Sequence, residues 1–134
     1  MGIALGDPSG FTAKFILSQS TAFDLFIGED FNNGNNNGDL QVHFDWLFSP
    51  AILGRGPGFT VPIYFGLGGV VEIDDNFNND VDLGIRAPLG IAFLFQKAPL
   101  ELFIELGLEL IFIDNNNNDD DFDIDAVVGL RYYF

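Results

Sequence analysis

The sequence predicts an all-β protein, and more specifically an eight-stranded antiparallel up-and-down barrel that occupies residues 1–134 as a single domain. Three observations support this fold class. Apolar residues alternate with polar or small ones along eight segments, and this period of two is typical of strands with two unlike faces. Turns or polar loops separate consecutive segments, which indicates an antiparallel meander. Eight strands are also enough to close a small barrel.

The alternation is most regular in residues 100–113 and 122–134. The predicted strands, in order, are residues 2–6, 11–18, 21–28, 40–48, 61–73, 81–96, 100–113 and 122–134. Short turns follow at residues 7–10, 18–20 and 97–99, and a longer Gly- and Pro-rich connection is predicted at residues 49–60. Three loops of nearly pure Asn and Asp lie at residues 29–39, 74–80 and 114–121. In an antiparallel meander, these three loops fall at the end opposite the termini.

Each predicted strand has one strongly apolar face, and together these faces hold most of the 16 phenylalanines. The interior of an eight-stranded barrel is only wide enough for side chains to fill, so the apolar faces do not all fit inside. The opposite faces carry charged residues and glycines, among them Gly90, Gly107 and Gly129. We therefore predict a polar lumen and an apolar outer wall. Such a wall would aggregate in water but suits lipid, which predicts a transmembrane β-barrel.

Aromatic residues on the outer wall are predicted to gather at two heights. One aromatic girdle lies at the end with the termini and the short turns, and comprises Phe23, Trp46, Phe48, Phe93, Phe95, Tyr132 and Phe134. Phe11, Phe112 and Phe122 lie at the opposite end. Two aromatic belts that flank an aliphatic band are typical of membrane barrels, because these rings favour the membrane–water interfaces.

Charged residues alternate onto the inward faces. The predicted lumen ion-pair network comprises Lys14, Asp24, Asp45, Glu72, Arg86, Glu101, Glu105, Glu109, Asp125 and Arg131. By height along the strands, Arg86 should meet Glu105 or Glu109, and Arg131 should meet Glu101. The favoured interpretation is a structural network of ion pairs and water that plugs the lumen. The alternative is an acid-lined path that prefers cations.

Composition and motifs argue against several classes of function. The formal net charge of −15 disfavours nucleic acid as a partner. The chain has no Cys and one His, so neither a thiolate site nor a His-rich zinc site is expected. A hydrolase site built from His43, Asp45 and Ser18 or Ser20 is not predicted, because the serines lie at a turn and no Gly-x-Ser-x-Gly motif occurs. The acidic residues 74–75 and 119–121 lack EF-hand spacing and favour solvated loops over a Ca²⁺ site. No enzymatic activity, cofactor or metal is predicted.

Three segments of the chain resemble a known family. They are the closing strand at residues 129–134, with sequence GLRYYF, the segment LGIRAPLG at residues 83–90, and the segment APLELF at residues 98–103. Together they resemble a family of small, functionally uncharacterised bacterial outer-membrane barrels, closely over residues 60–134 and loosely before them. The overall architecture is similar to the eight-stranded transmembrane domain of outer-membrane protein A.

This resemblance implies a location in the bacterial outer membrane, a lipid bilayer or detergent as surroundings, and recognition of the closing strand by the outer-membrane barrel assembly machinery. It implies no catalytic residue, and a porin-like monomer is expected. The loops of nearly pure Asn and Asp, and the leader peptide missing from this chain, depart from the family pattern. These departures indicate an idealised or computationally designed member.

The function predicted from the sequence is that of a membrane-embedded structural scaffold with a packed lumen and no catalytic activity. A narrow cation-preferring channel is the first alternative, and stable conductance steps in a planar bilayer would favour it. A soluble lipocalin-like binding barrel, with its apolar faces turned inward, is the second alternative. Folding in buffer without detergent would favour the soluble barrel.

Overall fold

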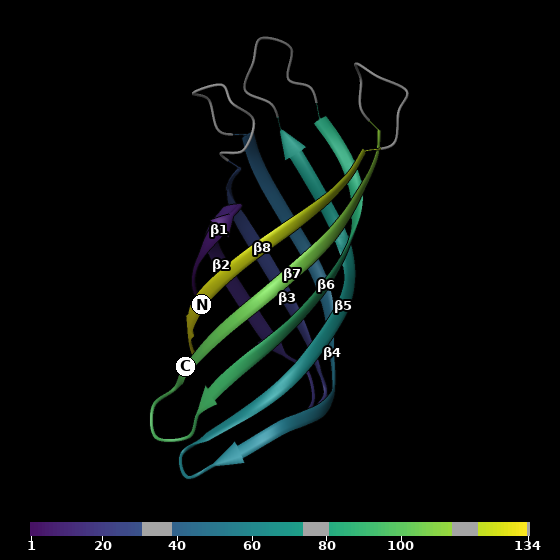
Figure 1. Cartoon of the computed structure of the whole chain (residues 1–134). Coiled ribbons are helices and arrows are strands. Elements are labelled where there is room, and N and C mark those ends of the chain that lie inside the picture. The colour runs from purple at the N-terminus through teal and green to yellow at the C-terminus, as the bar shows by residue number, and fades with distance from the viewer. Residues whose placement is uncertain (31–38, 74–80, 114–120, 134) are drawn as a thin grey trace.

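The computed structural model describes residues 1–30, 39–73, 81–113 and 121–133. They form a closed barrel in which eight antiparallel strands follow one another in sequence order, which confirms the predicted up-and-down barrel (Figure 1). The strands are β1 (Gly2–Asp7), β2 (Ser9–Ile16), β3 (Thr21–Asp30), β4 (Asp39–Gly56), β5 (Phe59–Ile73), β6 (Val81–Phe95), β7 (Leu100–Ile113) and β8 (Asp121–Tyr132). No helix among these residues is long and apolar enough to cross a membrane.

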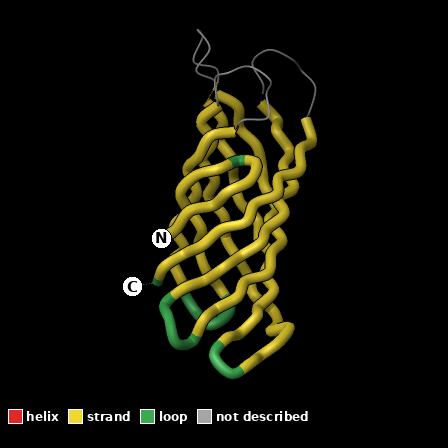
Figure 2. Tube along the Cα trace, turned by 60° about the vertical axis from the view of Figure 1, so that its left-hand side comes forward, coloured by secondary structure: helices red, strands yellow, loops and turns green. Residues whose placement is uncertain are grey.

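The first and last strands close the barrel. β1 pairs with β8 from Gly2 opposite Arg131 to Asp7 opposite Ala126. The seam continues beyond β1, because the Tyr132 N–H donates to the Met1 carbonyl at 2.8 Å. The strands wind around the barrel at a tilt to its long axis (Figure 2), as closure of a sheet requires. Because the number of strands is even, β1 begins and β8 ends on the side of the barrel with the β2–β3, β4–β5 and β6–β7 turns, and the N-terminus lies near mid-height in Figure 1.

The polar face of each strand points inward. Along β7, Glu105 is 5% exposed, whereas its neighbour Leu106 is 49% exposed. The same alternation in the other strands leaves thirty-four large hydrophobic side chains exposed in the described part of the chain, against nine buried hydrophobic residues. The prediction of a polar interior and an apolar outer wall is thus confirmed.

Glycines make room for the large rings that fill the interior. Tyr64 and Phe103 are almost completely buried. A Cβ atom on Gly90, which pairs with Tyr64 across β5 and β6, would lie 2.3 Å from the Tyr64 ring. A Cβ atom on Gly129 would lie 2.3 Å from the Phe103 ring. Because both contacts are shorter than van der Waals packing permits, any larger residue at these positions must displace a buried ring.

We therefore expect Gly90→Ala to lower the free energy of unfolding by about 1–3 kcal/mol, the usual effect of overpacking a filled interior. Gly69→Ala is the matched control, because Gly69 is exposed and its Cβ would meet only the Gly84 carbonyl oxygen, at 3.9 Å. Urea titration of the folded barrel in detergent micelles measures both free energies. Equal effects of the two substitutions would contradict the packing described here.

The prediction of a long connection at residues 49–60 is wrong. β4 continues to Gly56, β5 begins at Phe59, and only Pro57 and Gly58 separate them. Gly58 has a φ of 107°, which a side chain would strain. Two register shifts, between Phe48 and Ala51 and between Ile52 and Gly54, insert extra residues into β4. These bulges accommodate Pro50, which lacks a backbone N–H donor. The resulting β4–β5 hairpin extends beyond the other strands (Figure 1).

Apart from this hairpin, the observed strand ends lie within two residues of the predicted ones. The predicted turn at residues 7–10 contracts to Pro8 alone, because β1 reaches Asp7 and β2 begins at Ser9. β8 ends at Tyr132, and the predicted end at Phe134 lies outside the described residues.

Pro88 lies in the middle of β6, where a proline would be expected to cause a bulge. The register of β6 with β5 is nevertheless the same on both sides of it, from Phe65 opposite Leu89 to Gly68 opposite Arg86. The neighbouring Gly66 explains this fit, since a Cβ atom there would lie 3.0 Å from Cγ of the Pro88 ring. The ring therefore occupies space that a glycine leaves open, and the strand continues without an inserted residue.

Candidate functional site in the polar lumen

Two buried arginines organise the lumen, each within its own cluster of carboxylates. Arg131, on β8, is 1% exposed and donates from Nη1 to Glu101 at 2.7 Å and from Nη2 to Asp24. Its Nε and Nη2 atoms donate to Thr12 Oγ1 at 3.0 and 2.9 Å. The guanidinium carbon lies 3.7 Å from the centre of the Phe103 ring, a cation–π geometry. The predicted pairing of Arg131 with Glu101 is therefore present.

Lys14 extends this first cluster toward the end with the short turns. Its Nζ atom lies 3.2 Å from Glu101 Oε2 and 5.1 Å from the centre of the Tyr64 ring. Tyr133, just beyond β8, also donates its hydroxyl to Glu101. Burial raises the pKa of the Tyr133 phenol, so it remains a donor at ordinary pH. Glu101 thus accepts hydrogen bonds from two cations and one phenol.

Arg86, on β6, forms the second cluster, nearer the long loops. Its guanidinium contacts four carboxylates: Asp45 at 2.6 Å, Glu105 at 2.9 Å, Glu109 at 3.0 Å and Asp125 at 3.5 Å. Both of the predicted partners, Glu105 and Glu109, are therefore present. All five side chains are buried. A guanidinium suits this role because it presents five donors in a fixed plane.

The strand register brings the Arg86 cluster together. Arg86 pairs with Glu109 across β6 and β7. Gly107, two residues before Glu109 on the same face, gives the guanidinium space, because a Cβ atom there would lie 2.6 Å from Arg86 Nη2. Asp45, on β4, pairs with Gly68 of β5, and Gly68 pairs with Arg86, so the Asp45 and Arg86 side chains meet over a glycine that has no side chain of its own. The cluster therefore follows from the register of consecutive strands.

Neutral side chains complete the hydrogen bonding of both clusters. Tyr64 donates its hydroxyl to Glu105 at 2.8 Å. Gln41 donates to Glu72 at 2.7 Å and to Glu109 at 3.1 Å, so Glu72 joins the network through an amide. Thr12, Tyr64 and Gln41 were not among the predicted members of the network. Their alternation onto inward faces was visible in the sequence, but no opposite charge singled them out.

Side chains fill the space between the clusters. The cavity at the centre measures about 10 Å³, which is room for about one water molecule. Its lining includes Arg86, Arg131 and the buried ring of Pro8, which the turn between β1 and β2 places inside the wall. The described part of the lumen is thus closed at mid-height rather than open along its length.

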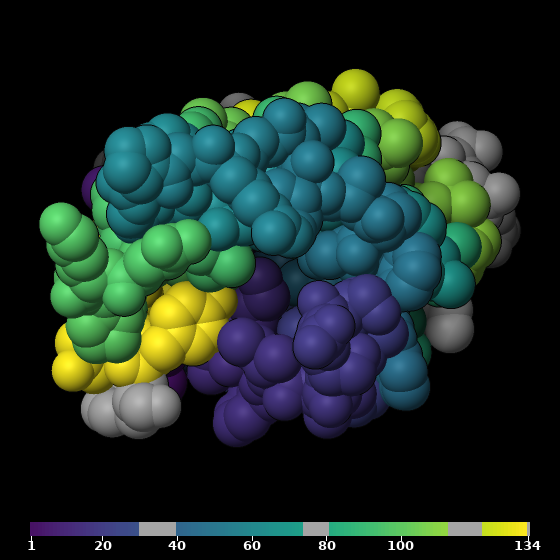
Figure 3. Space-filling view, turned by 90° about the horizontal axis from the view of Figure 1, so that it is seen from below, coloured from purple at the N-terminus to yellow at the C-terminus, as the bar shows by residue number. Residues whose placement is uncertain are grey.

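A larger cavity opens at the end with the short turns, and we call it the vestibule. It has a volume of about 490 Å³ and lies between the β2–β3 turn and the β4–β5 hairpin. Lys14, Glu101 and Tyr133 line it together with Arg55 of the hairpin. Figure 3, which views the molecule from this end, shows the hollow between the purple β2–β3 segment and the teal hairpin. The vestibule ends at the Arg131 cluster.

The serines considered for catalysis lie beside the vestibule, and His43 lies in the lumen. Ser18 Oγ is 2.7 Å from Thr21 Oγ1 and accepts the Ser20 and Thr21 N–H groups, so it stabilises the turn. His43 is 3% exposed and stacks on Phe26 with ring centres 4.9 Å apart. The structure therefore gives these serines a local structural role.

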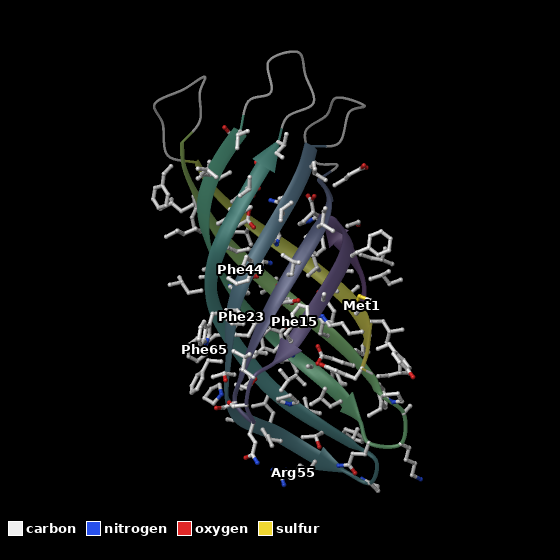
Figure 4. All side chains as sticks on the ribbon, turned by 180° about the vertical axis from the view of Figure 1, so that it is seen from behind. Met1, Phe15, Phe23, Phe44, Arg55 and Phe65 are labelled. Atoms are coloured by element: carbon white, nitrogen blue, oxygen red, sulfur yellow. The ribbon has the colours of Figure 1, made fainter. Side chains whose placement is uncertain are left out.

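The outer wall carries aromatic rings in contact at the predicted girdle. Phe23 stacks on Phe44 at 5.1 Å and meets Trp46 edge-on at 4.5 Å, and Phe48 meets Phe65 at 5.6 Å. Figure 4 shows Phe15, Phe23, Phe44 and Phe65 on the outside of the strands. Phe93 is half-buried, whereas Phe95 and Tyr132 are exposed; Phe134 lies outside the described residues. The predicted girdle did not include Phe15, Phe44 and Phe65, although each pairs with a girdle residue or lies two positions from one.

No protein-family model matches the chain, and neither the search of curated proteins nor that of solved structures found a match.

Proposed function

We propose that this protein is an integral β-barrel of the bacterial outer membrane, with a structural scaffold role and a lumen packed by side chains. The exposed apolar wall carries the proposal. Side chains such as Leu67, Leu106 and Ile124 are 65%, 49% and 59% exposed around the barrel. Monomeric soluble proteins rarely expose apolar patches larger than a few hundred Å², whereas a membrane barrel requires one on every side.

The dimensions of the wall support the same proposal. A tilted strand needs about 9–11 residues to cross the hydrocarbon core. β5, β6 and β7 have 15, 15 and 14 residues, and β8 has 12. The ring contacts among Phe23, Phe44 and Trp46 group aromatic side chains at one level, which fits an interfacial belt. β1 and β2, with 6 and 8 residues, are shorter than this length, so the support from strand length comes from the other strands.

The outer membrane is proposed over other membranes for two reasons. Closed antiparallel barrels with short turns at the end of the termini are the spanning form used there. The closing strand β8 also presents alternating apolar residues, Val128, Leu130 and Tyr132, on its outward face. Such a strand is what the outer-membrane assembly machinery would recognise, and it makes that machinery the proposed partner during insertion. We propose that the barrel works as a monomer.

Folding by environment tests the membrane assignment. Urea-denatured protein diluted into detergent micelles or lipid vesicles should fold and migrate on gels with a mobility that changes on heating. Dilution into buffer alone should give aggregates, because the apolar wall lacks a partner. A monodisperse, folded monomer in buffer would contradict the proposal and favour the soluble binding barrel.

The tight centre of the lumen favours a scaffold over a channel. A cavity of about 10 Å³ between the two arginine clusters leaves no room for a hydrated ion. We therefore expect no stable conductance steps when the folded barrel is reconstituted in a planar bilayer. Cation-preferring steps that disappear in Glu105→Gln would contradict the packed lumen and favour the channel, because acid-lined pores select cations.

A further inference from the structure

One group of ligand-type atoms lies at the edge of the Arg86 cluster and adds an imidazole to two of its carboxylates. His43 on β4, Glu109 on β7 and Asp125 on β8 each offer one atom, and these three atoms lie within 4.8 Å of one another. All three residues are buried: His43 is 3%, Glu109 1% and Asp125 5% exposed. Three strands that are far apart in the sequence therefore aim an imidazole and two carboxylates at one point.

Two of these atoms lack the hydrogen bonds that buried polar atoms normally make. His43 Nε2 and Asp125 Oδ2 have no hydrogen-bond partner, and Asp125 Oδ2 has only the ion-pair contact with Arg86 Nε at 3.5 Å. More than about 90% of buried polar groups in proteins are satisfied, so each exception calls for a reason. The His43 ring is held against Phe26 at an interplanar angle of 28°, which fixes the direction of Nε2. A buried imidazole nitrogen and a nearby carboxylate oxygen that both lack hydrogen bonds are the arrangement expected around a ligand-binding position.

The spacing fits a metal ion. His43 Nε2 lies 3.6 Å from Glu109 Oε1. Ligand atoms about 2.0–2.2 Å from a tetrahedral metal centre lie roughly 3.4 Å apart. The remaining separations reach at most 4.8 Å, so binding would need the carboxylates to move closer to the imidazole.

The charge balance favours a cation at this point. Arg86 is the cation in contact with Asp45, Glu105, Glu109 and Asp125, so four carboxylates surround one guanidinium. Unpaired charge is expensive in a buried site. A divalent ion at His43 would offset two of these negative charges, and the neutral imidazole would add none.

We propose that His43, Glu109 and Asp125 bind one divalent transition-metal ion, of which Zn²⁺ is the representative. Imidazole nitrogen with carboxylate oxygen suits Zn²⁺ and its first-row neighbours, whereas Ca²⁺ and Mg²⁺ prefer oxygen alone. The ion would tie β4 to β7 and β8 across the lumen. This site goes beyond the scaffold role and does not depend on which membrane holds the barrel.

Calorimetry of the tag-free folded barrel in detergent micelles tests the site with Zn²⁺ as the probe. One ion per chain is expected to bind. His43→Gln and Asp125→Asn should each weaken binding by at least about tenfold, since loss of an outer-shell partner alone has this effect. Asp123→Asn is the matched control, because Asp123 is exposed on the same strand and should leave binding unchanged. Binding that survives His43→Gln would place the ion on exposed acidic residues and overturn the proposal.

A measurement on the unmodified chain removes any dependence on variants that fold poorly. His43 is the single histidine of the sequence. Pulsed electron paramagnetic resonance with Cu²⁺ bound at one equivalent should therefore show modulation from one imidazole nitrogen. Copper bound by oxygen alone, without this nitrogen signal, would equally overturn the proposal.

Discussion

Arg86→Met should destabilise the barrel more than any other single substitution of a lumen residue. It removes the guanidinium from Asp45, Glu105, Glu109 and Asp125 and leaves these buried carboxylates without their cation. Breaking a buried ion pair by removing one partner lowers stability by about 3–5 kcal/mol. Proteins are stable by only about 5–15 kcal/mol, so the folded fraction should fall sharply. The heat-modifiable gel band and the urea midpoint in micelles measure this loss.

Two further variants separate lost charge from lost packing at Arg86. Arg55→Met is the control, because Arg55 is exposed on the β4–β5 hairpin (Figure 4) and should change stability by less than about 0.5 kcal/mol. Asp45→Asn with Glu105→Gln in the Arg86→Met background should recover part of the stability, because fewer charges remain unpaired. Arg86→Met and Arg55→Met with equal stability would contradict the role assigned to the cluster.

Leu106→Arg should lower the free energy of unfolding in lipid vesicles by about 2–4 kcal/mol. Leu106 lies at the middle of β7, points outward and is 49% exposed. An arginine on the lipid face costs about 2–4 kcal/mol at the bilayer midplane and about 0–1 kcal/mol near the interfaces. The free energy of unfolding in phospholipid vesicles, followed by urea titration, measures the effect.

Leu53→Arg controls for the chemistry of the Leu106 substitution. Leu53 is 59% exposed on the part of β4 that extends past the other strands, so it should lie near or beyond the interface. Its replacement should change stability by no more than about 1 kcal/mol. A wall that faces water would show no such depth dependence, and equal effects at the two positions would argue against a bilayer around β7.

The sequence was sufficient to predict the barrel and the orientation of its faces. The period of two in residues 100–113 assigns Glu105 and Leu106 to opposite faces, and the narrow interior decides which face is inside. Pairing of neighbouring strands also placed Arg86 near Glu109, since both heights follow from the register. These features depend on local alternation and strand order, which a single sequence contains.

Features that depend on irregular pairing or on closure were not predictable. Residues 49–60 have the composition of a loop, and only the bulges at Phe48 and Ile52 turn them into a hairpin. The contact of Arg86 with Asp45 passes over Gly68 and depends on the register of both β4 and β6 with β5. The meeting of His43 with Asp125 crosses the lumen, because it joins β4 to β8. Side-chain positions across the lumen follow from barrel tilt and stagger, which alternation alone does not specify.

Trp46 allows the most direct test of an apolar wall that faces lipid. It is the single tryptophan of the sequence, is 51% exposed and lies in the aromatic girdle. Its fluorescence in vesicles that contain phospholipids brominated at different acyl depths reports whether the ring touches lipid and at what depth. Strong quenching, greatest for bromine near the headgroups, is the result predicted. A folded barrel whose Trp46 is unaffected by every brominated lipid but quenched by aqueous iodide would contradict it.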